Sequence, residues 1–331
     1  MPSVSVVLPV FNGVRTIGRA VRSILDQTLR DIELIVVDDG STDGTFDVLQ
    51  GIRDPRLRAV SRPHRGVVEA ANTGTELADA PLIARMDADD YAYPERLERQ
   101  QQLLFDEALD VVGCQVRIVN ESDAPISSMV RYQRWINDET ATRSQIMAFR
   151  FVEFPLVNPT LLARRRYFEL GFVQGDFPED YDLMLRAAAL GMRFGKVPVV
   201  LLDWMDHSSG LTRSDLRYSP IAFFRCRQLH LLSGPLRGTR EVDVWGVGKT
   251  GNPWIRTLLD SGIAIRRAFD ISDRKIGTTI HGVPVSHPHD LPTTDGTPLI
   301  VAVGAQGARE IILPQIQACG YVAGHDAWFV A

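Results

Sequence analysis

The stretch Asp38-Asp39-Gly40-Ser41-Thr42-Asp43 decides the fold, because it follows directly on the apolar run from Ile32 to Val37. A short apolar run that ends in a polar, glycine-containing turn and then passes into helical spacing is typical of a sheet flanked by helices. Here the helical spacing runs from Thr45 to Ile52, and the same order of segments recurs on both sides of the quoted stretch. We therefore expect an α/β protein with a mostly parallel sheet.

The first half of the chain contains several such units. The buried strands that we expect are Val4 to Val10, Ile32 to Val37, Leu82 to Met86 and Val111 to Val116. Helical spacing covers Thr16 to Gln27, Thr45 to Ile52 and Val67 to Ala78, and Pro94 is expected as the first helical residue of a segment that reaches about Phe105. The region from about Asp123 to Phe154 is less regular, and we expect surface insertions there.

A second series of strands and helices begins near Val242. The residues from Val242 to Trp245 favour a strand, followed by a glycine-rich turn and a helix to about Leu259. Further strands are expected at Ala264 to Phe269 and Leu299 to Val303, which makes a small α/β domain. This domain resembles small Rossmann-like nucleotide-binding domains. The joint is expected between about Ser214 and Arg240, so the predicted domains are residues 1–235 and 241–331.

Composition limits the partners of the 331-residue chain. Its formal net charge of −5 argues against a nucleic-acid-binding protein, because neutralising phosphates requires an excess of Lys and Arg. The sequence contains no apolar stretch long enough to cross a bilayer and no signal-peptide pattern, so we expect a cytoplasmic protein, with peripheral membrane association left open. Its three cysteines lack metal-type spacing, and reduced, buried thiols are expected.

Three polar clusters each follow the end of a predicted strand: Pro9-Val10-Phe11-Asn12, the stretch at 38–43, and Asp87-Ala88-Asp89-Asp90. Each alone could be an ordinary turn or helix N-cap. In an open parallel sheet, however, ligands bind outside the carboxyl ends of the strands, so the three clusters point at one site. Crowded carboxylates are unfavourable unless a cation offsets them, which favours Mg²⁺ or Mn²⁺.

The order of these motifs closely resembles that of family-2 glycosyltransferases of the GT-A fold. The resemblance rests on Pro-x-Phe-Asn, Asp-Asp-Gly-Ser-x-Asp-x-Thr, Gly66 through Ala70 with Asn72 and Gly74, and Asp-x-Asp-Asp. It extends through the stretch from Pro178 to Arg186, which is similar to the Glu-Asp motif of that family, and covers about the first 215 residues. It implies an inverting enzyme that moves a sugar from a nucleotide diphosphate to an acceptor hydroxyl.

The resemblance implies a role for each donor-site residue. Phe11, or the backbone around Pro9, would pack against a nucleobase, with Asn12 in the same cluster, and Asp39 would accept a hydrogen bond from an imide N–H, which favours a uridine donor. Asp87 would hold ribose or metal, and Asp89 would be the principal ligand of Mn²⁺ or Mg²⁺. The remaining candidates are Arg65 for base or phosphate and His207 near the diphosphate or metal, although Met205 stands where relatives often have an arginine.

Glu179 and Asp180 are the catalytic candidates. They open a predicted helix whose buried face includes Tyr181, Met184 and Leu185. Carboxylates at a helix N-terminus can simply complement its dipole. The resemblance instead implies that Asp180 is the general base and that Glu179 orients it or binds acceptor hydroxyls.

The second domain contains a candidate nucleotide-binding turn formed by Gly246, Gly248, Lys249 and Gly251, with Asp270 at the end of the next strand. Glycines there let a backbone approach a pyrophosphate. Asn252 and Pro253 suggest an N-cap and first helical residue, and thus a late helix start. Ligand binding or sensing and a docking role stay open for this domain, with hydride transfer a smaller alternative because the domain is short.

Two other functions stay open for the whole chain, namely a catalytically silent nucleotide-sugar sensor and a dehydrogenase built on the second domain. The donor base after uridine would be thymidine or guanosine. The sequence leaves the acceptor open, and a surface polysaccharide, a lipid-linked glycan and a protein are the alternatives. For the stretch Arg131-Tyr132-Gln133-Arg134-Trp135 we favour an ordinary solvated helix, with contact to an anionic acceptor as the alternative.

Overall fold

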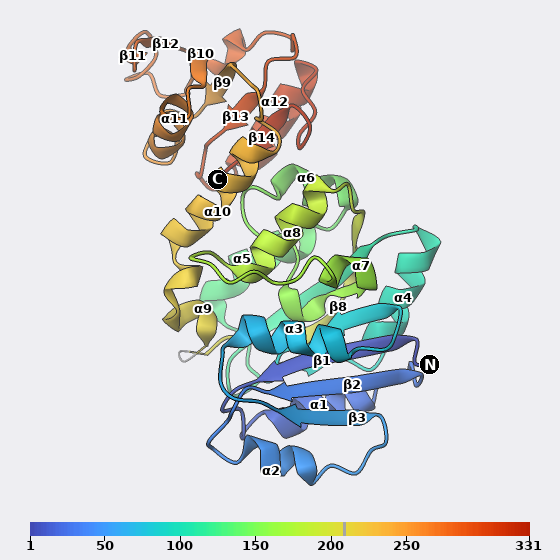
Figure 1. Cartoon of the computed structure of the whole chain (residues 1–331). Helices are drawn as coiled ribbons and strands as arrows, with labels where there is room; N and C mark the ends of the chain where they lie inside the picture. Colours follow the sequence, from blue (N-terminus) through green and yellow to red (C-terminus); the bar gives the residue numbers. More distant parts are fainter. Residues whose placement is uncertain (208–209) are drawn as a thin grey trace. The chain divides into compact units, whose positions relative to one another are not determined.

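The computed structural model describes residues 1–207 and 210–331, which form two compact units. The first unit consists of residues Met1–Ile146 and Pro155–Ala222, and the second of Met147–Phe154 and Phe223–Ala331 (Figure 1). The second unit thus includes eight residues, 147–154, from the middle of the chain. The proposed boundary between residues 235 and 241 lies beyond the long helix α10, Pro220–Ser233, and stays a prediction about separable folding.

The first unit is built on an eight-stranded sheet in the order β3-β2-β1-β4-β7-β6-β8-β5. Strands β3, β2, β1 and β4 are parallel to one another, whereas β7 runs antiparallel to β4 and β6. The strands are β1 Val4–Val10, β2 Ile32–Asp38, β3 Leu57–Ser61, β4 Leu82–Arg85, β5 Tyr91–Ala92, β6 Val111–Val119, β7 Leu162–Arg164 and β8 Phe194–Met205.

Helices cover this sheet, and Figure 1 shows α3 in front of β1 and β2. All seven residues of β1 are buried, as expected of a central strand with covered faces. The helices of this unit are α1 Ile17–Leu25, α2 Thr45–Gln50, α3 Val67–Leu77, α4 Arg96–Asp106, α5 Val130–Arg134, α7 Arg165–Phe168, α8 Glu179–Ala189 and α9 Leu211–Ser214, with α6 Arg143–Phe149 shared between the units. The mostly parallel α/β sheet is confirmed, but α4 begins at Arg96 rather than at Pro94.

The irregular region after β6 has a defined structure. Strand β6 pairs with β7 only through Val111 and Val112, so the rest of that edge needs other partners. Side chains of the following segment supply them: the backbone N–H of Ile118 donates to Gln133 Oε1 at 2.7 Å, and that of Val116 donates to Asn137 Oδ1 at 2.9 Å. The short helical turns at Ser127–Met129 and Trp135–Glu139 flank α5 along this edge.

The second unit has a six-stranded sheet in the order β11-β12-β10-β9-β13-β14. Its five parallel strands, taken in chain order, lie in the sequence 3-2-1-4-5, the arrangement of a Rossmann-type sheet. The elements are β9 Glu241–Trp245, α11 Gly251–Asp260, β10 Ala264–Phe269, β11 Thr279–Ile280, β12 Val283–Ser286, β13 Leu299–Val301, α12 Ala308–Ala318 and β14 Ala327–Phe329.

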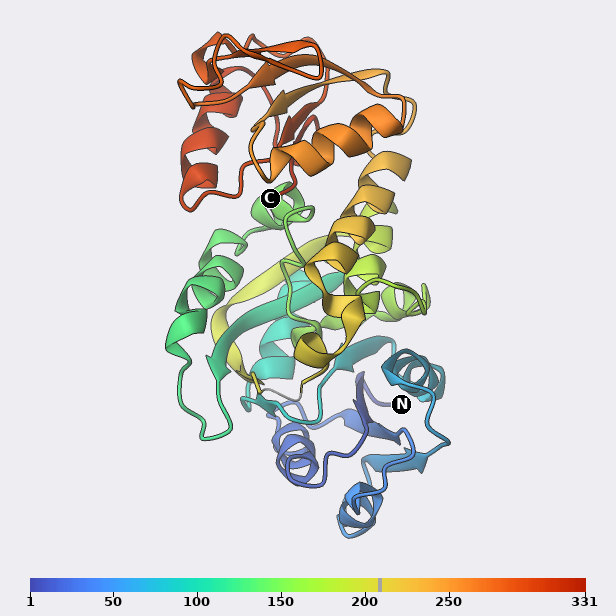
Figure 2. The same ribbon diagram turned by 90° about the vertical axis from the view of Figure 1, so that its left-hand side faces the viewer.

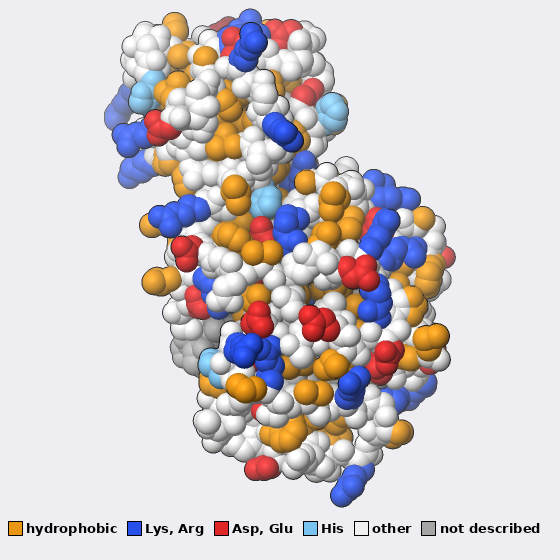
Figure 3. All heavy atoms as spheres, in the orientation of Figure 1, with side chains coloured by type: hydrophobic (Ala, Val, Ile, Leu, Met, Phe, Trp, Pro, Cys, Tyr) orange, Lys and Arg blue, Asp and Glu red, His pale blue; other side chains and the backbone are white. Residues whose placement is uncertain are grey.

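Three further findings concern the whole described chain. Within residues 1–207 and 210–331, no helix is long and apolar enough to span a bilayer. Among the described residues, Cys114, Cys226 and Cys319 form no disulfide bond, and the first two are buried as expected, whereas Cys319 is partly exposed. On the face drawn in Figure 3, basic and acidic side chains are interspersed, without an extended area of one sign.

Candidate active site

Carboxylates crowd the loop that follows β4. Asp90 is buried, with 1% exposure, and its Oδ1 accepts a hydrogen bond from the backbone N–H of Met205 at 2.8 Å. Asp87 pairs with the guanidinium of Arg85 at 3.1 Å. Removal from water raises the pKa of both Asp87 and Asp90, and the neighbouring charge of Asp89 raises each further. This loop therefore holds more negative charge than its surroundings compensate.

Asp89 and His207 come together from the ends of β4 and β8. His207 Nε2 lies 2.9 Å from Asp89 Oδ2, and both side chains keep part of their surface exposed. The hydrogen bond and charge of Asp89 raise the pKa of His207. The described residues contain no group of three or more His, Cys, Asp or Glu side chains placed to hold a metal. A pair of donors fits Mg²⁺ or Mn²⁺ that takes its other ligands from substrate phosphates and water.

Two buried arginines lie beneath the acidic loop. Arg96 is fully buried and donates to the carbonyl oxygens of Arg85 and Pro159, each at 2.8 Å. Arg85 itself donates to the carbonyl of Met86 at 2.7 Å. Sequence reasoning missed both residues. A signal was present, because Arg85 interrupts an otherwise apolar strand, and a charge in such a position requires a partner.

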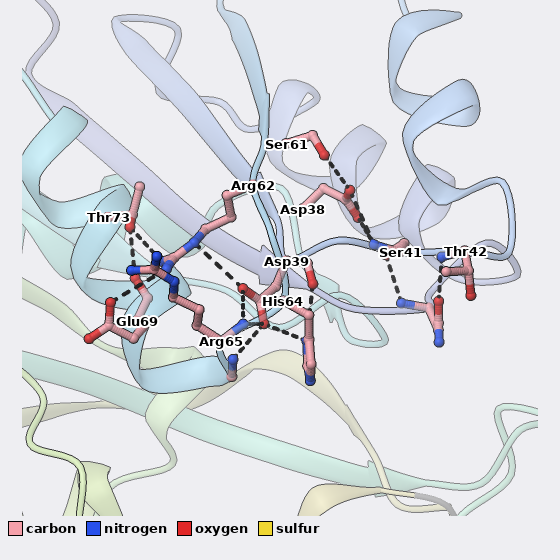
Figure 4. A network of polar contacts seen from close by, with 12 residues as sticks. Asp38, Asp39, Ser41, Thr42, Ser61, Arg62, His64, Arg65, Glu69 and Thr73 are labelled. Atoms are coloured by element: carbon pink, nitrogen blue, oxygen red, sulfur yellow. Dashed lines mark hydrogen bonds and ion pairs between the residues drawn. The ribbon is translucent and has the colours of Figure 1, made fainter.

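Asp39 fixes the loop that leads into α3 (Figure 4). Its buried carboxylate accepts hydrogen bonds from the backbone N–H groups of Arg65 and Gly66, at 3.1 and 2.7 Å. His64 Nδ1 lies 2.8 Å from the same carboxylate, and Arg62 Nε lies 3.6 Å away. A carboxylate has about four lone-pair sites, so these contacts use most of the hydrogen-bonding capacity of Asp39.

The residue that follows Asp39 must be glycine. Gly40 has φ of +77°, and a Cβ atom built there would lie 2.8 Å from the backbone nitrogen of His64. Residues that carry a Cβ atom are excluded here, both because the backbone is left-handed and because the backbone of His64 lies so close. The Asp-Asp-Gly motif therefore brings the loop at 62–66 against the end of β2.

Phe11 presents an exposed ring at this site. The ring stacks on His64 with centroids 4.0 Å apart and an interplanar angle of 26°, while 47% of Phe11 remains exposed. Asn12 has φ of +53°, and its Oδ1 accepts from the backbone N–H of Thr42 at 2.9 Å, so it holds the neighbouring loop. Pro9 lies within β1 opposite Val37. The sequence analysis did not identify His64, which shows no distinguishing pattern in the chain.

Arg65 supplies a cation at the start of α3. Its backbone is bound by Asp39, whereas its side chain is exposed and forms no ion pair with any described residue. Arg62, by contrast, contacts Thr73 Oγ1 at 2.7 Å and Glu69 at 3.4 Å. Of these two arginines, Arg65 is the one available to an anionic ligand.

Glu179 and Asp180 open α8, as expected. Glu179 is buried and accepts a hydrogen bond from the hydroxyl of Tyr218 at 2.7 Å, with the guanidinium of Arg217 at 3.9 Å. Asp180 keeps some exposure, yet surrounding atoms exclude enough water to raise its pKa to about 8, and the charges of Glu179 and Asp87 add to this effect. The carboxylate of Asp87 in the acidic loop is therefore near enough to the start of α8 to disfavour ionisation of Asp180.

Asp182, also in the first turn of α8, has a charged partner within the same helix. Its carboxylate is buried and pairs with Arg186 at 2.8 Å, one turn along the same helix. Tyr218, which binds Glu179, was missed because its position is set by the tertiary fold rather than by a local pattern.

The sequence of residues 5–174, just over half of the chain, matches the profile described as Glycosyl transferase family 2. The chain belongs to this family. Its membership confirms the resemblance to family-2 glycosyltransferases stated above. The motifs at Asp39, Asp89 and the loop before α3 all lie within the matched region.

Two named relatives are similar in sequence to part of this chain. The chain is 29% identical over 195 residues to the chondroitin synthase of Pasteurella multocida (strain Pm70), which covers 58% of the chain and 19% of that protein. It is 26% identical over 234 residues to the O-antigen biosynthesis glycosyltransferase WbnJ of Escherichia coli, covering 68% of the chain and 88% of that protein. The chain thus spans about a fifth of the synthase and most of WbnJ.

Solved structures confirm the GT-A fold. The complex of S. aureus TarS 1-349 with UDP-GlcNAc superposes with a TM-score of 0.56 at 19% identity, covering 79% of this chain and 80% of that one. The mannosyltransferase PcManGT from Pyrobaculum calidifontis, in complex with GDP-Man and Mn²⁺, gives a TM-score of 0.52 at 21% identity, with coverages of 79% and 69%. At these identities the likeness establishes the architecture alone.

The second unit of the glycosyltransferase contains a tight glycine turn between β9 and α11. A Cβ atom on Gly251 would lie 1.7 Å from the carbonyl oxygen of Gly246, so only glycine allows the helix to approach the turn. Helix α11 begins at Gly251, three residues after Gly248, which agrees with the expected late start. The expected N-cap at Asn252 is wrong, because Thr250 caps the helix and Pro253 fits within the first turn, where its missing N–H costs no hydrogen bond.

Asp270 closes that turn from the end of β10. Its carboxylate accepts from the backbone N–H groups of Val247 and Ser272, at 3.1 and 2.9 Å, and from Lys275 Nζ at 2.8 Å. These hydrogen bonds lower the pKa of Asp270 against the opposing effect of burial, which is the largest single influence. Lys249 is exposed at the tip of the turn. The predicted residues thus gather at one place, and Lys275 joins them.

Proposed function

We propose that this family-2 glycosyltransferase moves a sugar from a nucleoside diphosphate sugar, with uridine the favoured base, to the hydroxyl group of a glycan or glycoconjugate acceptor. Transfer inverts the anomeric configuration and requires Mn²⁺ or Mg²⁺. The observation that carries the proposal is Asp180, a carboxylate with a pKa near 8 at the start of a helix beside the acidic loop. A carboxylate whose ionised form is disfavoured, at the start of a helix beside the acidic loop, is suited to take a proton from an acceptor hydroxyl.

The donor half of the site is formed by the ends of β1, β2 and β4. The exposed ring of Phe11 offers a face for a nucleobase. Asp39 holds the adjoining loop and is proposed to accept the imide N–H of uracil, with His64 giving way on binding. Arg65 is proposed to contact the diphosphate, because its guanidinium is exposed and unpaired among the described side chains.

Asp89 and His207 are proposed to hold the metal, with Asp87 nearby for ribose or metal. The bound ion would supply charge compensation for the leaving diphosphate. The two donors already lie 2.9 Å apart, and both remain accessible. The pKa values of Asp87 and Asp90 are raised, and a bound cation would stabilise the ionised form of both carboxylates, which is a further reason to expect a cation here.

Asp180 is proposed as the general base. The acceptor hydroxyl passes its proton to the free carboxylate oxygen of Asp180 while the acceptor oxygen forms its bond to the anomeric carbon. The bond from that carbon to the diphosphate oxygen breaks on the opposite face, and the electron pair leaves with the diphosphate. Glu179, held by Tyr218, is proposed to orient Asp180 or to bind acceptor hydroxyls.

A donor screen tests the proposal. Purified protein is incubated with UDP-, dTDP- and GDP-sugars and Mn²⁺, and the release of nucleoside diphosphate is followed with and without EDTA. We expect slow release from one donor class and none in EDTA. Binding of a donor without any release, with or without candidate acceptors, would instead favour the catalytically silent sensor.

A second proposal concerns the glycine turn of the second unit, formed by Gly246, Gly248, Lys249 and Gly251. We infer that it binds a phosphate-bearing ligand, because backbone N–H groups at the start of α11 and the ammonium groups of Lys249 and Lys275 lie at this turn. Calorimetry of the full chain with nucleotides and dinucleotides, with donor present in saturating amount, tests this. Uniformly absent binding would favour a docking role for the unit.

A further inference from the structure

Three aromatic rings lie together beside the acidic loop. Tyr132 of α5 is 5.8 Å from Trp135, nearly parallel to it, and 6.1 Å from Trp204 of β8. Trp135 is buried, with 7% exposure, whereas Tyr132 and Trp204 each keep part of their surface exposed. We call Tyr132, Trp135 and Trp204 the aromatic platform. It has a buried base and an accessible upper side.

The aromatic platform is continuous with the candidate active site. The residue after Trp204 is Met205, whose backbone N–H donates to Asp90. Two residues further along, His207 contacts Asp89. Figure 2 shows the green segment around residue 130 running beside the yellow β8 strand. A molecule on the platform would therefore lie next to the carboxylates that face the donor.

The platform is held in place before any ligand arrives. The side chain of Gln133 binds the open edge of β6 at Ile118, and Asn137 exchanges two hydrogen bonds with Val116 at 2.9 and 2.8 Å. These contacts flank Tyr132 and Trp135 in the sequence, so neither ring can shift freely. Rings that are already fixed lose little conformational entropy on binding.

Two cations border the platform. Arg131 and Arg134 are exposed, and neither forms an ion pair with any residue in the described part of the chain. Other surface arginines nearby are neutralised, since Arg117 pairs with Asp203 at 2.6 Å and Arg19 pairs with Asp123 at 2.7 Å. Arg131 and Arg134 directly precede Tyr132 and Trp135 in the chain, and guanidinium groups together with aromatic rings suit a ligand that carries both apolar ring faces and carboxylates.

We propose that the aromatic platform with Arg131 and Arg134 is the acceptor subsite and binds an acidic oligosaccharide. A pyranose ring packs its C–H face on Tyr132 and Trp204, and its carboxylate meets the two guanidinium groups. The inference rests on the proposed function and names the substrate class of the same site. Trp135 is buried, so this part of the stretch does not face solvent as a simple solvated helix would, whereas Arg131 and Arg134 do.

Affinity for acceptor oligosaccharides tests the subsite. The probes are hexasaccharides of hyaluronan, chondroitin and galacturonate, with maltohexaose as the neutral counterpart, titrated calorimetrically into the full chain. We expect at least one acidic probe to bind more tightly than maltohexaose. Tyr132→Ala should weaken that binding by roughly five- to tenfold, and Arg131→Ala with Arg134→Ala should abolish the preference for the acidic probe.

Matched controls keep the result specific. Phe105→Ala removes another exposed ring and Arg99→Ala another exposed arginine, and neither should alter acceptor binding. Tyr132→Leu keeps apolar volume but removes the ring, and serves if the alanine variant does not fold. Acidic probes that bind no better than maltohexaose, or variants that bind as well as the unmodified chain, would overturn the proposal. Nucleoside diphosphate release without acceptor separates this failure from failure of the transferase function itself.

Discussion

Replacement of Asp180 by Asn should make the protein more stable and nearly inactive. The pKa of Asp180 is raised to about 8 from an ordinary 3.8, so its ionised form is unfavourable in the folded state. The destabilisation is absent below about pH 3.8, grows as the pH rises, and is complete above about pH 8. The amide of Asn never carries this charge, so the stability difference between variant and unmodified protein should increase with pH over that range.

The size of the effect follows from the same numbers. One pKa unit corresponds to about 1.4 kcal/mol, so the difference between about 8 and 3.8 sets an upper limit of roughly 5 to 6 kcal/mol. Because the side chain keeps some contact with solvent, which screens its neighbours, we expect on the order of 2 to 3 kcal/mol at pH 9. Donor affinity should survive, while transfer falls by about two to four orders of magnitude, as expected for loss of a general base.

Urea unfolding of the metal-free protein at pH 5 and pH 9 measures the stability difference, and product formation measures transfer. Asp176→Asn is the matched control, because Asp176 is an exposed aspartate of the loop before α8. Equal stability of the Asp180→Asn and Asp176→Asn variants at pH 9 would refute the burial argument. A normal transfer rate in Asp180→Asn would move the base to Glu179, since Asp182 is tied to Arg186. Loss of donor binding would mean that Asp180 is a binding residue.

Three further outcomes are expected. Asp89→Asn should nearly abolish transfer without unfolding the protein, because an amide cannot compensate a cation's charge, and full activity of the unmodified enzyme in EDTA would contradict this. Gly251→Ala should cost about 3 kcal/mol of stability in thermal unfolding, since the new Cβ would overlap the Gly246 carbonyl. Gly248→Ala is the matched control and should cost far less, because its new Cβ meets only the flexible end of Lys275, at 3.3 Å. Equal costs of the two substitutions would contradict the packing argument. A fragment of residues 1–234 should fold and bind nucleotide. Its folded state should be less stable than that of the full chain, because the fragment lacks Phe329 and Trp328, which pack on residues 149 and 151. A soluble fragment that binds no donor in the presence of metal would show that the second unit completes the site.

Local patterns carried the central elements of both sheets. The strand at Val4–Val10 was predicted with the bounds that the structure has, because a short and mostly apolar run is typical of a strand that is buried on both faces. The strand at Ala264–Phe269 was also predicted with the bounds that the structure has. By contrast, β3, β7 and β8 were missed. Strand β3 is a half-buried edge strand, β7 has only three residues, and β8 has the exposed residues Pro198 and Val199 in its middle.

The sequence by itself determined the chemistry available to this glycosyltransferase. The acidic loop, the Asp-Asp-Gly turn and the Glu-Asp pair are local motifs at strand ends or a helix start, so their positions could be recognised from the sequence. The resemblance to the family then singled out Asp89, His207 and Asp180 before their geometry was known. The order of the motifs along the chain was also sufficient to indicate the family.

The tertiary structure alone decided which groups surround those motifs. Three examples are His64 on Phe11, Tyr218 on Glu179, and Arg96 beneath the acidic loop. In the first two, about 40 residues of chain or more separate the partners, and no local pattern encodes such contacts. The pKa of Asp180 likewise depends on how many atoms exclude water around it and on charges from other elements. Burial and long-range electrostatics are properties of the packed chain, so they become visible only when the chain is folded.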